Sequence, residues 1–115
     1  MTLQWPRRGE VWLVNFDPGR GSEQRGIRPA LIVQNDIGNR HAATTIVAAI
    51  TSTIKGYPVT VPLKKGEAGL KQSSMVNLAQ ILTIDKSRLQ RRLGGLRAET
   101  VNIVNAAIQI SLDLS

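Results

Sequence analysis

The sequence predicts a mainly β fold, a small and partly closed barrel of antiparallel strands with a helix at the C-terminal end. Three observations lead to this expectation. Short apolar, β-branched runs recur up to residue 84, Gly- and Pro-rich segments separate them, and the apolar spacing becomes helical only from residue 98. Many short strands with Gly-rich turns in a small chain favour a barrel, and the helix would then cover an open end or one face.

The expected strands follow in order from alternation and composition. We expect them at residues 10–16, 29–35, 44–50 and 57–63, with one bent strand or two short ones at 73–84. The first run alternates with period two. The second opens on Pro29, which a strand tolerates as its first residue, and two prolines in the fourth indicate an edge strand. The intervening segments, including 36–43 and 64–71, are expected to be loops.

The character of the chain changes after the last strand. Asp85 is a suitable N-cap for a short helix over residues 86–92, and Gly94 and Gly95 then interrupt the pattern. From Ala98 onward, apolar residues recur with helical spacing and form one stripe. The members of this stripe are Val101, Val104, Ala107, Ile108 and Leu112.

Composition limits the class of protein and its compartment. The 115 residues fit one domain, and 42% hydrophobic residues with only 3% aromatic ones require an aliphatic core. The absence of cysteine excludes disulfides and thiolate zinc sites and suits a reducing cytosol. No apolar run approaches the ~20 residues that a membrane span needs, so we expect a cytoplasmic protein without a membrane partner.

The charge balance points to a class of partner. Fifteen basic and eight acidic residues give a net charge of +7. Such a domain favours a polyanion or an acidic protein electrostatically. The alternative is that the basic balance serves solubility alone, because the charges are spread along the chain rather than gathered in a tail.

The polar residues exclude several kinds of catalysis and leave one open. His41 is the only histidine, and no HExxH motif, Cys/His cluster, dense acidic group or P-loop occurs, so we predict no metal site and no cofactor. The remaining set of Arg, Thr, Ser, Gln and Glu can still promote cleavage of RNA. RNA carries its own nucleophile, the 2′-OH, so a protein needs no activated side chain. It must align that hydroxyl, stabilise charge on the phosphorane and help a proton leave the 2′-oxygen and reach the 5′-oxygen.

A long stretch of the chain resembles a known family. RRGEVWLVNFDPGRGSEQRGIRPALIVQND (7–36) is similar to the N-terminal half of the MazF/PemK toxins, the sequence-specific endoribonucleases of bacterial toxin–antitoxin pairs. The similarity continues through IVAAITS (46–52), KGYPVTVPL (55–63) and NLAQILTIDKSRL (77–89), so it covers nearly the whole chain. We therefore expect residues 1–115 to form a single toxin domain of this type.

The resemblance implies both architecture and activity. It implies an SH3-like barrel, shared with the gyrase-poisoning toxin CcdB, and a homodimer. It implies metal-independent, sequence-specific cleavage of single-stranded RNA that leaves a 2′,3′-cyclic phosphate and a 5′-OH. It also implies inhibition by a cognate acidic antitoxin, which would fold as it binds across the basic groove.

The resemblance also assigns two catalytic residues. Arg28, the arginine before proline in GSEQRGIRP, matches the family's catalytic arginine, which acts in acid/base chemistry and stabilises the phosphate. Thr51, which closes the third expected strand, matches its partner on the phosphate. From the residues alone, Arg28 could instead form a surface ion pair with Glu23 or Asp36. Thr51 could equally serve only the local turn, because Ser and Thr often bond their own backbone.

The expected substrate-binding residues come from two segments. Ser22, Glu23 and Gln24 occupy the loop where the family contacts RNA, although hydrogen bonds within the loop explain Ser22 and Gln24 equally well. Arg25 is assigned to the RNA phosphate backbone. Gln80 matches a glutamine near the family's active site, but the preceding position, often acidic in relatives, is alanine here.

Two other functions of the same fold remain open from sequence. The chain could bind RNA without cutting it, because fold alone does not decide chemistry. It could also be a CcdB-like gyrase binder. The gyrase-poisoning relatives use a penultimate tryptophan, and this sequence ends SLDLS, which argues against that alternative.

Overall fold

The computed structural model describes residues 5–18, 25–53 and 59–114. Six strands and two α-helices lie in this part of the chain, with two short 3-10 helices between strands. In order they are β1 (Glu10–Asn15), β2 (Ile27–Ile32), α1 (Asp36–His41), β3 (Thr44–Thr51), β4 (Thr60–Leu63), η1 (Glu67–Gly69), β5 (Ser74–Asp85), η2 (Lys86–Arg88), β6 (Leu89–Gly95) and α2 (Ala98–Ser111).

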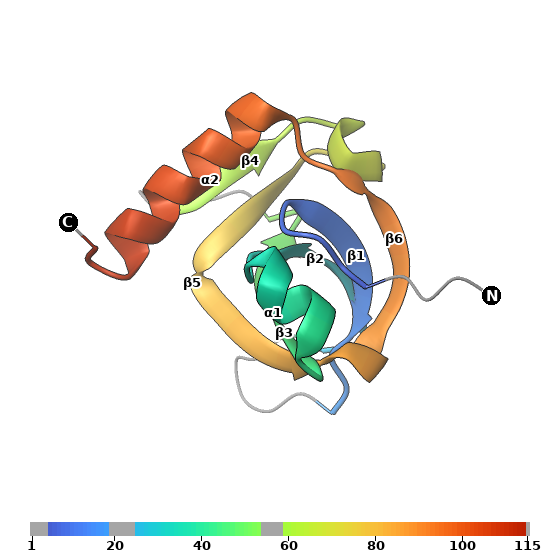
Figure 1. Ribbon diagram of the computed structural model, residues 1–115. Coiled ribbons are helices and arrows are strands. Elements are labelled where there is room, and N and C mark those ends of the chain that lie inside the picture. The colour runs from blue at the N-terminus through green and yellow to red at the C-terminus, as the bar shows by residue number, and fades with distance from the viewer. Residues whose placement is uncertain (1–4, 19–24, 54–58, 115) are drawn as a thin grey trace.

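The described strands form one antiparallel sheet in the order β4-β5-β3-β2-β1-β6. The sheet curls round so that β1, β3, β5 and β6 surround a common centre, and α2 lies outside beside β4 and β5 (Figure 1). The expected barrel-like β fold with a C-terminal helix is confirmed, and β4 is an edge strand as its proline predicts. Within the described ranges, no helix has the length and apolar character required to cross a membrane.

Both faces of the sheet bury apolar side chains because the strands curl. Val11, Leu31 and Ile50 belong to a cluster that includes Val104 and Ala107 of α2. Trp12, Val14 and Phe16 point to the opposite face and form a second cluster with other strand residues. The core is mostly aliphatic, as the composition requires, and Trp12 is a packing residue that is only 8% exposed.

The segment after the second strand was expected to be a loop, and this expectation is wrong. Asp36–His41 form the short helix α1. The side chain of Asn35 accepts a hydrogen bond from Gly38 N at 2.8 Å and caps the helix. The fully buried Asn39 accepts from Thr45 Oγ1 at 2.7 Å and from Gln34 Nε2 at 3.0 Å. These tertiary bonds stabilise a helix that its short, Gly-containing sequence does not predict.

The prediction of a short helix over residues 86–92 is also wrong in the length of the helix. Asp85 does cap a helical turn, accepting from Ser87 N at 2.8 Å, but the turn ends at Arg88. The chain then pairs with β1 as β6, up to Gly95. Cross-strand pairing overrides the local helical preference of this segment.

Smaller differences concern the ends of strands. β2 begins at Ile27, two residues before Pro29, and β5 is a single strand whose pairing with β3 shifts between Ala48 and Ala49. The expected fourth strand includes residues 57 and 58, which lie outside the described part; its described portion begins at Thr60. The expected loop 64–71 contains the 3-10 helix η1.

Candidate active site

The pairing of β2 with β3 puts the two predicted catalytic residues at the same end of neighbouring strands. Ala30 pairs with Ala49, and Leu31 with Ala48. The paired residues end at Ala30 and Ala49, and Arg28 and Thr51 each lie two residues beyond them, at the same end of the two strands. Residues directly opposite each other in such a pair present their side chains on the same face. Two residues that are distant in sequence therefore lie at one end of neighbouring strands.

Arg28 is exposed, and its orientation is set locally. It is the second residue of β2 and pairs with Val14 of β1. Its Nε donates to the carbonyl of Arg25 at 3.0 Å. Among the described residues Arg28 forms no ion pair, and Asp36 accepts instead from Arg8 N at 2.7 Å. The alternative partner Glu23 lies outside the described residues.

Thr51 makes the local turn contact that was considered from sequence. Its Oγ1 accepts from Thr53 N at 3.1 Å, which is the local turn contact. Its side chain is half-buried at the end of β3. A hydroxyl that accepts one hydrogen bond can still donate its proton, so the turn contact leaves Thr51 able to bond a phosphate oxygen.

The loop between β1 and β2 is fixed at its base. Phe16 N donates to Gly26 O, and Asp17 Oδ1 accepts from Gly26 N, both at 2.9 Å. Arg88 of η2 donates to two backbone carbonyls at the start of the loop. Sequence reasoning did not identify Asp17 or Arg88, because each acts through backbone atoms of a distant segment. The predicted contacts Ser22, Glu23 and Gln24 lie outside the described residues, and Arg25 is exposed at the loop's end.

The fifth strand contributes a predicted residue and an unpredicted one. Gln80 is half-buried in the stretch between Asn77, which pairs with Ala49, and Ile81, which pairs with Ala48. It therefore lies on the strand beside β3. Asn77 was not predicted as a site residue. By its pairing, the Asn77 side chain shares the sheet face of Ala49, which is also the face of Thr51.

Comparison with known proteins identifies the family. Residues 7–112 match the family described as PemK-like, MazF-like toxin of type II toxin–antitoxin systems. The chain belongs to this family. It is 46% identical over 110 residues to a protein named Endoribonuclease MazF from Staphylococcus saprophyticus, covering 94% of this chain and 92% of that one.

Solved structures of MazF-like toxins share the fold. One is an endoribonuclease in complex with its cognate antitoxin from a mycobacterial species, with a TM-score of 0.82 and 30% identity over 96% of this chain and 97% of that one. Another is a MazE–MazF structure from Deinococcus radiodurans, with a TM-score of 0.80 and 28% identity over 97% and 99% of the two chains. The resemblance inferred from GSEQRGIRP is thus confirmed.

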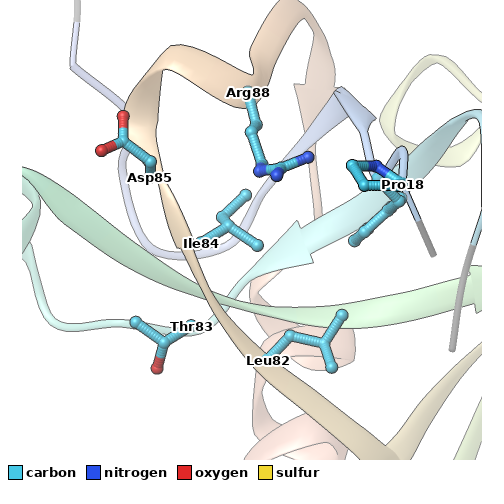
Figure 2. Close-up of a pocket in the computed structure, with 7 residues that line it drawn as sticks. Pro18, Leu82, Thr83, Ile84, Asp85 and Arg88 are labelled. Atoms are coloured by element: carbon cyan, nitrogen blue, oxygen red, sulfur yellow. The ribbon is translucent and has the colours of Figure 1, made fainter. Parts of the chain in front are cut away.

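Beside the loop base, this MazF-like chain has a pocket of about 220 Å³. Figure 2 shows its apolar walls, Leu82 and Ile84 of β5, with Pro18 on the other side and the Arg88 side chain between them. The Asp85 carboxylate points away from this space. Hydrogen bonds from the backbone and side chain of Ser87 lower the pKa of Asp85, with a smaller contribution from the positive charge of Arg88.

Other candidate side chains of the MazF-like chain lie on or beside α1. His41 ends α1 and has no assigned role. Trp5 stacks under the guanidinium of Arg40, which is 5.3 Å from the ring centroid. No group of three or more His, Cys, Asp or Glu suited to a metal ion occurs within the described ranges.

Proposed function

We propose that this chain is the endoribonuclease toxin of a toxin–antitoxin pair and that it cleaves single-stranded RNA without a metal ion. One observation carries the proposal: the antiparallel pairing of β2 with β3 puts Arg28, exposed near the start of β2, at the same end of the sheet as Thr51, the last residue of β3. An arginine and a hydroxyl on one sheet face can together bind a single phosphodiester.

The proposed reaction is in-line attack by the neighbouring 2′-OH. The bond from the 2′-oxygen to phosphorus forms, the bond from phosphorus to the 5′-oxygen breaks, and a 2′,3′-cyclic phosphate and a 5′-OH result. One proton leaves the 2′-oxygen and one reaches the 5′-oxygen. The guanidinium of Arg28 stays charged: it stabilises the non-bridging oxygens and hydrogen-bonds to the leaving 5′-oxygen, which takes its proton from water, while Thr51 donates a further hydrogen bond.

Substrate binding is assigned to the segments around this pair. Arg25 contacts the phosphate backbone, and Ser22, Glu23, Gln24 and Gln80 position the RNA strand. Glu23 is a candidate acceptor for the 2′-OH proton, because Arg28 stays charged and is a poor base. Single-stranded RNA is the expected substrate, since in-line geometry needs a flexible backbone and unstacked bases can be read. The net charge of +7 attracts such a strand.

We further propose that the whole chain acts as one toxin domain, as a homodimer in the cytoplasm, and that an acidic antitoxin blocks it. Relatives of the same fold have been solved with a cognate antitoxin or with MazE. An acidic, disordered segment would gain charge complementarity from a chain with 15 basic and 8 acidic residues.

The test is cleavage of a long single-stranded RNA in EDTA, with both product ends mapped. We expect cuts at one short sequence, with cyclic phosphate and 5′-OH ends. An oligonucleotide carrying a 2′-deoxy nucleotide just before the mapped cut should stay intact, because the nucleophile is missing. Tight, salt-sensitive RNA binding without products would refute the proposal and indicate an RNA-binding barrel.

A further inference from the structure

We propose that Arg88 is a positioning residue for this site: it holds the base of the β1–β2 loop and thereby sets the place of Arg28. The inference rests on the proposed function. Arg88 lies in η2, far from β2 in sequence; it falls within the family-like segment 77–89, but the resemblance assigns it no role. We call the contacts of Arg88 with Asn15 and Asp17, together with the bonds that Phe16 and Asp17 make with Gly26, the loop clasp.

The first part of the clasp joins η2 to the end of β1. Arg88 Nη1 donates to Asn15 O at 3.0 Å and to Asp17 O at 2.6 Å. Hydrogen bonds from a charged donor are stronger than neutral ones. Arg88 forms no ion pair among the described residues, and the Asp85 carboxylate points away from it (Figure 2). Its charge is therefore directed at the loop backbone.

The second part of the clasp joins the two ends of the loop. Asp17 N donates to Asn15 Oδ1 at 3.0 Å, and Asp17 Oδ1 accepts from Gly26 N at 2.9 Å. Phe16 N donates to Gly26 O at 2.9 Å. Gly26 has a φ of +72°, a conformation that favours glycine. The loop thus leaves and re-enters the sheet at a point that Arg88 fixes.

The loop clasp is connected to Arg28 through Ile27, its neighbour in β2, and through Arg25, whose carbonyl binds its side chain. Asn15 pairs with Ile27, and Arg28 follows in the same strand, opposite Val14. Arg25, just before Gly26, offers the carbonyl that orients Arg28 Nε at 3.0 Å. A shift of Gly26 therefore moves both the strand that carries the guanidinium and the carbonyl that orients it. Misplacement of a catalytic group by about 1 Å can cost about a hundredfold in rate.

The experiment compares Arg88→Met with Arg88→Lys and with the control Arg91→Met. Arg91 is an exposed arginine of β6, so its variant removes the same charge without touching the clasp. Single-turnover cleavage of a cognate RNA, RNA affinity, and amide exchange of residues 16–18 and 25–28 are measured for each. Exchange within β3 reports whether the fold is intact.

We expect Arg88→Met to cleave about tenfold to a hundredfold more slowly, with RNA affinity no weaker than in Arg91→Met. Exchange at Gly26 should rise in Arg88→Met only. Arg88→Lys, which keeps the charge but carries its nitrogen on a shorter side chain than the one that bears Nη1, should remain severalfold slower than wild type. If Arg88→Met fails to fold, Asp17→Ala tests the clasp from its other side. This variant should also cleave more slowly without losing RNA affinity.

Three results would overturn the inference. Arg88→Met could cut as fast as Arg91→Met, it could lose affinity rather than rate, or Arg88→Lys could restore full activity. Full rescue by lysine would make Arg88 a simple charge for RNA. If wild type itself cuts no RNA, the proposed function has failed; if wild type cuts and Arg88→Met cuts equally fast, only the positioning role has failed.

Discussion

Arg28 owes its suitability for phosphate chemistry to a combination of exposure and restraint. One nitrogen, Nε, is bound to the Arg25 carbonyl, which fixes the plane of the guanidinium. Its two terminal nitrogens make no hydrogen bond among the described residues and can donate as a fork. A side chain already held in place loses less conformational freedom when a phosphate binds. Thr51 is restrained similarly through its bond with Thr53 N.

Thr51 provides a direct test of the proposed hydroxyl contact. Thr51→Val keeps the branched shape but removes the hydroxyl, whereas Thr51→Ser keeps it. We expect single-turnover cleavage to fall on the order of a hundredfold in Thr51→Val, because one donor to the phosphate is lost. Thr51→Ser should keep most of the rate. Equal rates for wild type and Thr51→Val would restrict Thr51 to its turn contact.

The lowered pKa of Asp85, the cap of the η2 turn, predicts how the free energy of unfolding depends on pH. Its pKa in the folded protein is lowered from the ordinary value of 3.8, chiefly by the Ser87 backbone hydrogen bond. The Asp85 carboxyl therefore binds a proton more readily in the unfolded chain than in the folded one. Its contribution to the free energy of unfolding is present above pH 3.8 and is lost as the pH falls through the lower pKa of the folded protein.

The corresponding measurement uses Asp85→Asn, since asparagine is also a good N-cap. We expect the free energy of unfolding of wild type to fall more steeply than that of Asp85→Asn between pH 5 and pH 2, a range that brackets the ordinary carboxyl pKa at about 4. Denaturant unfolding at several pH values provides the comparison. Parallel curves for the two proteins would contradict this account of the cap.

At the element scale, the segments with strong periodicity were predictable and the short ones were not. β1, β3 and α2 occur where alternation or helical spacing predicts them. α1 was missed because its stability comes from the buried Asn39, whose partners Gln34 and Thr45 lie outside the helix. The helix expected over 86–92 was wrong because pairing with β1, which local sequence does not reveal, makes most of it strand.

The same distinction applies to the candidate site. Arg28, Thr51 and Gln80 could be named because they lie in motifs that resemble a family. Arg88 and Asp17 lie in the same family-like segments, but the resemblance assigns them no role, and their contribution depends on which backbone atoms the fold brings near them. The two Arg88 contacts each span more than 70 residues and leave no spacing pattern in the sequence.

The contact between η1 and β6 yields a prediction at this scale. A Cβ at Gly94 would lie 2.6 Å from the carbonyl carbon of Ala68, whereas at Gly95 the nearest atom is the flexible Arg92 guanidinium at 3.5 Å. We expect Gly94→Ala to lower the free energy of unfolding by about 1–3 kcal/mol, because backbone must move. Gly95→Ala should change it by less than about 0.5 kcal/mol. Denaturant unfolding that ranks the two equally would contradict this packing.

For the whole molecule, the curled sheet keeps the buried apolar side chains that stabilise the fold apart from the exposed residues of the candidate site. One face packs against α2, and most of the opposite face is filled by Trp12, Val14 and Phe16 with their neighbours. Arg28 and Thr51 lie at the end of the second face, where side chains become exposed. The net charge of +7 then attracts an anionic strand or an acidic antitoxin to the molecule, without itself determining where cleavage occurs.

The most direct test of the central claim, that Arg28 performs the chemistry, compares Arg28→Ala with Arg25→Ala. Each variant removes one exposed arginine from the same end of the loop, so they form a matched pair. Single-turnover cleavage in EDTA and RNA affinity are measured on one cognate oligonucleotide. We expect Arg28→Ala to lose cleavage by at least about a hundredfold while it still binds RNA. Arg25→Ala should bind more weakly but cleave at nearly the wild-type rate once saturated. Cleavage by Arg28→Ala at the wild-type rate under saturation would contradict the account.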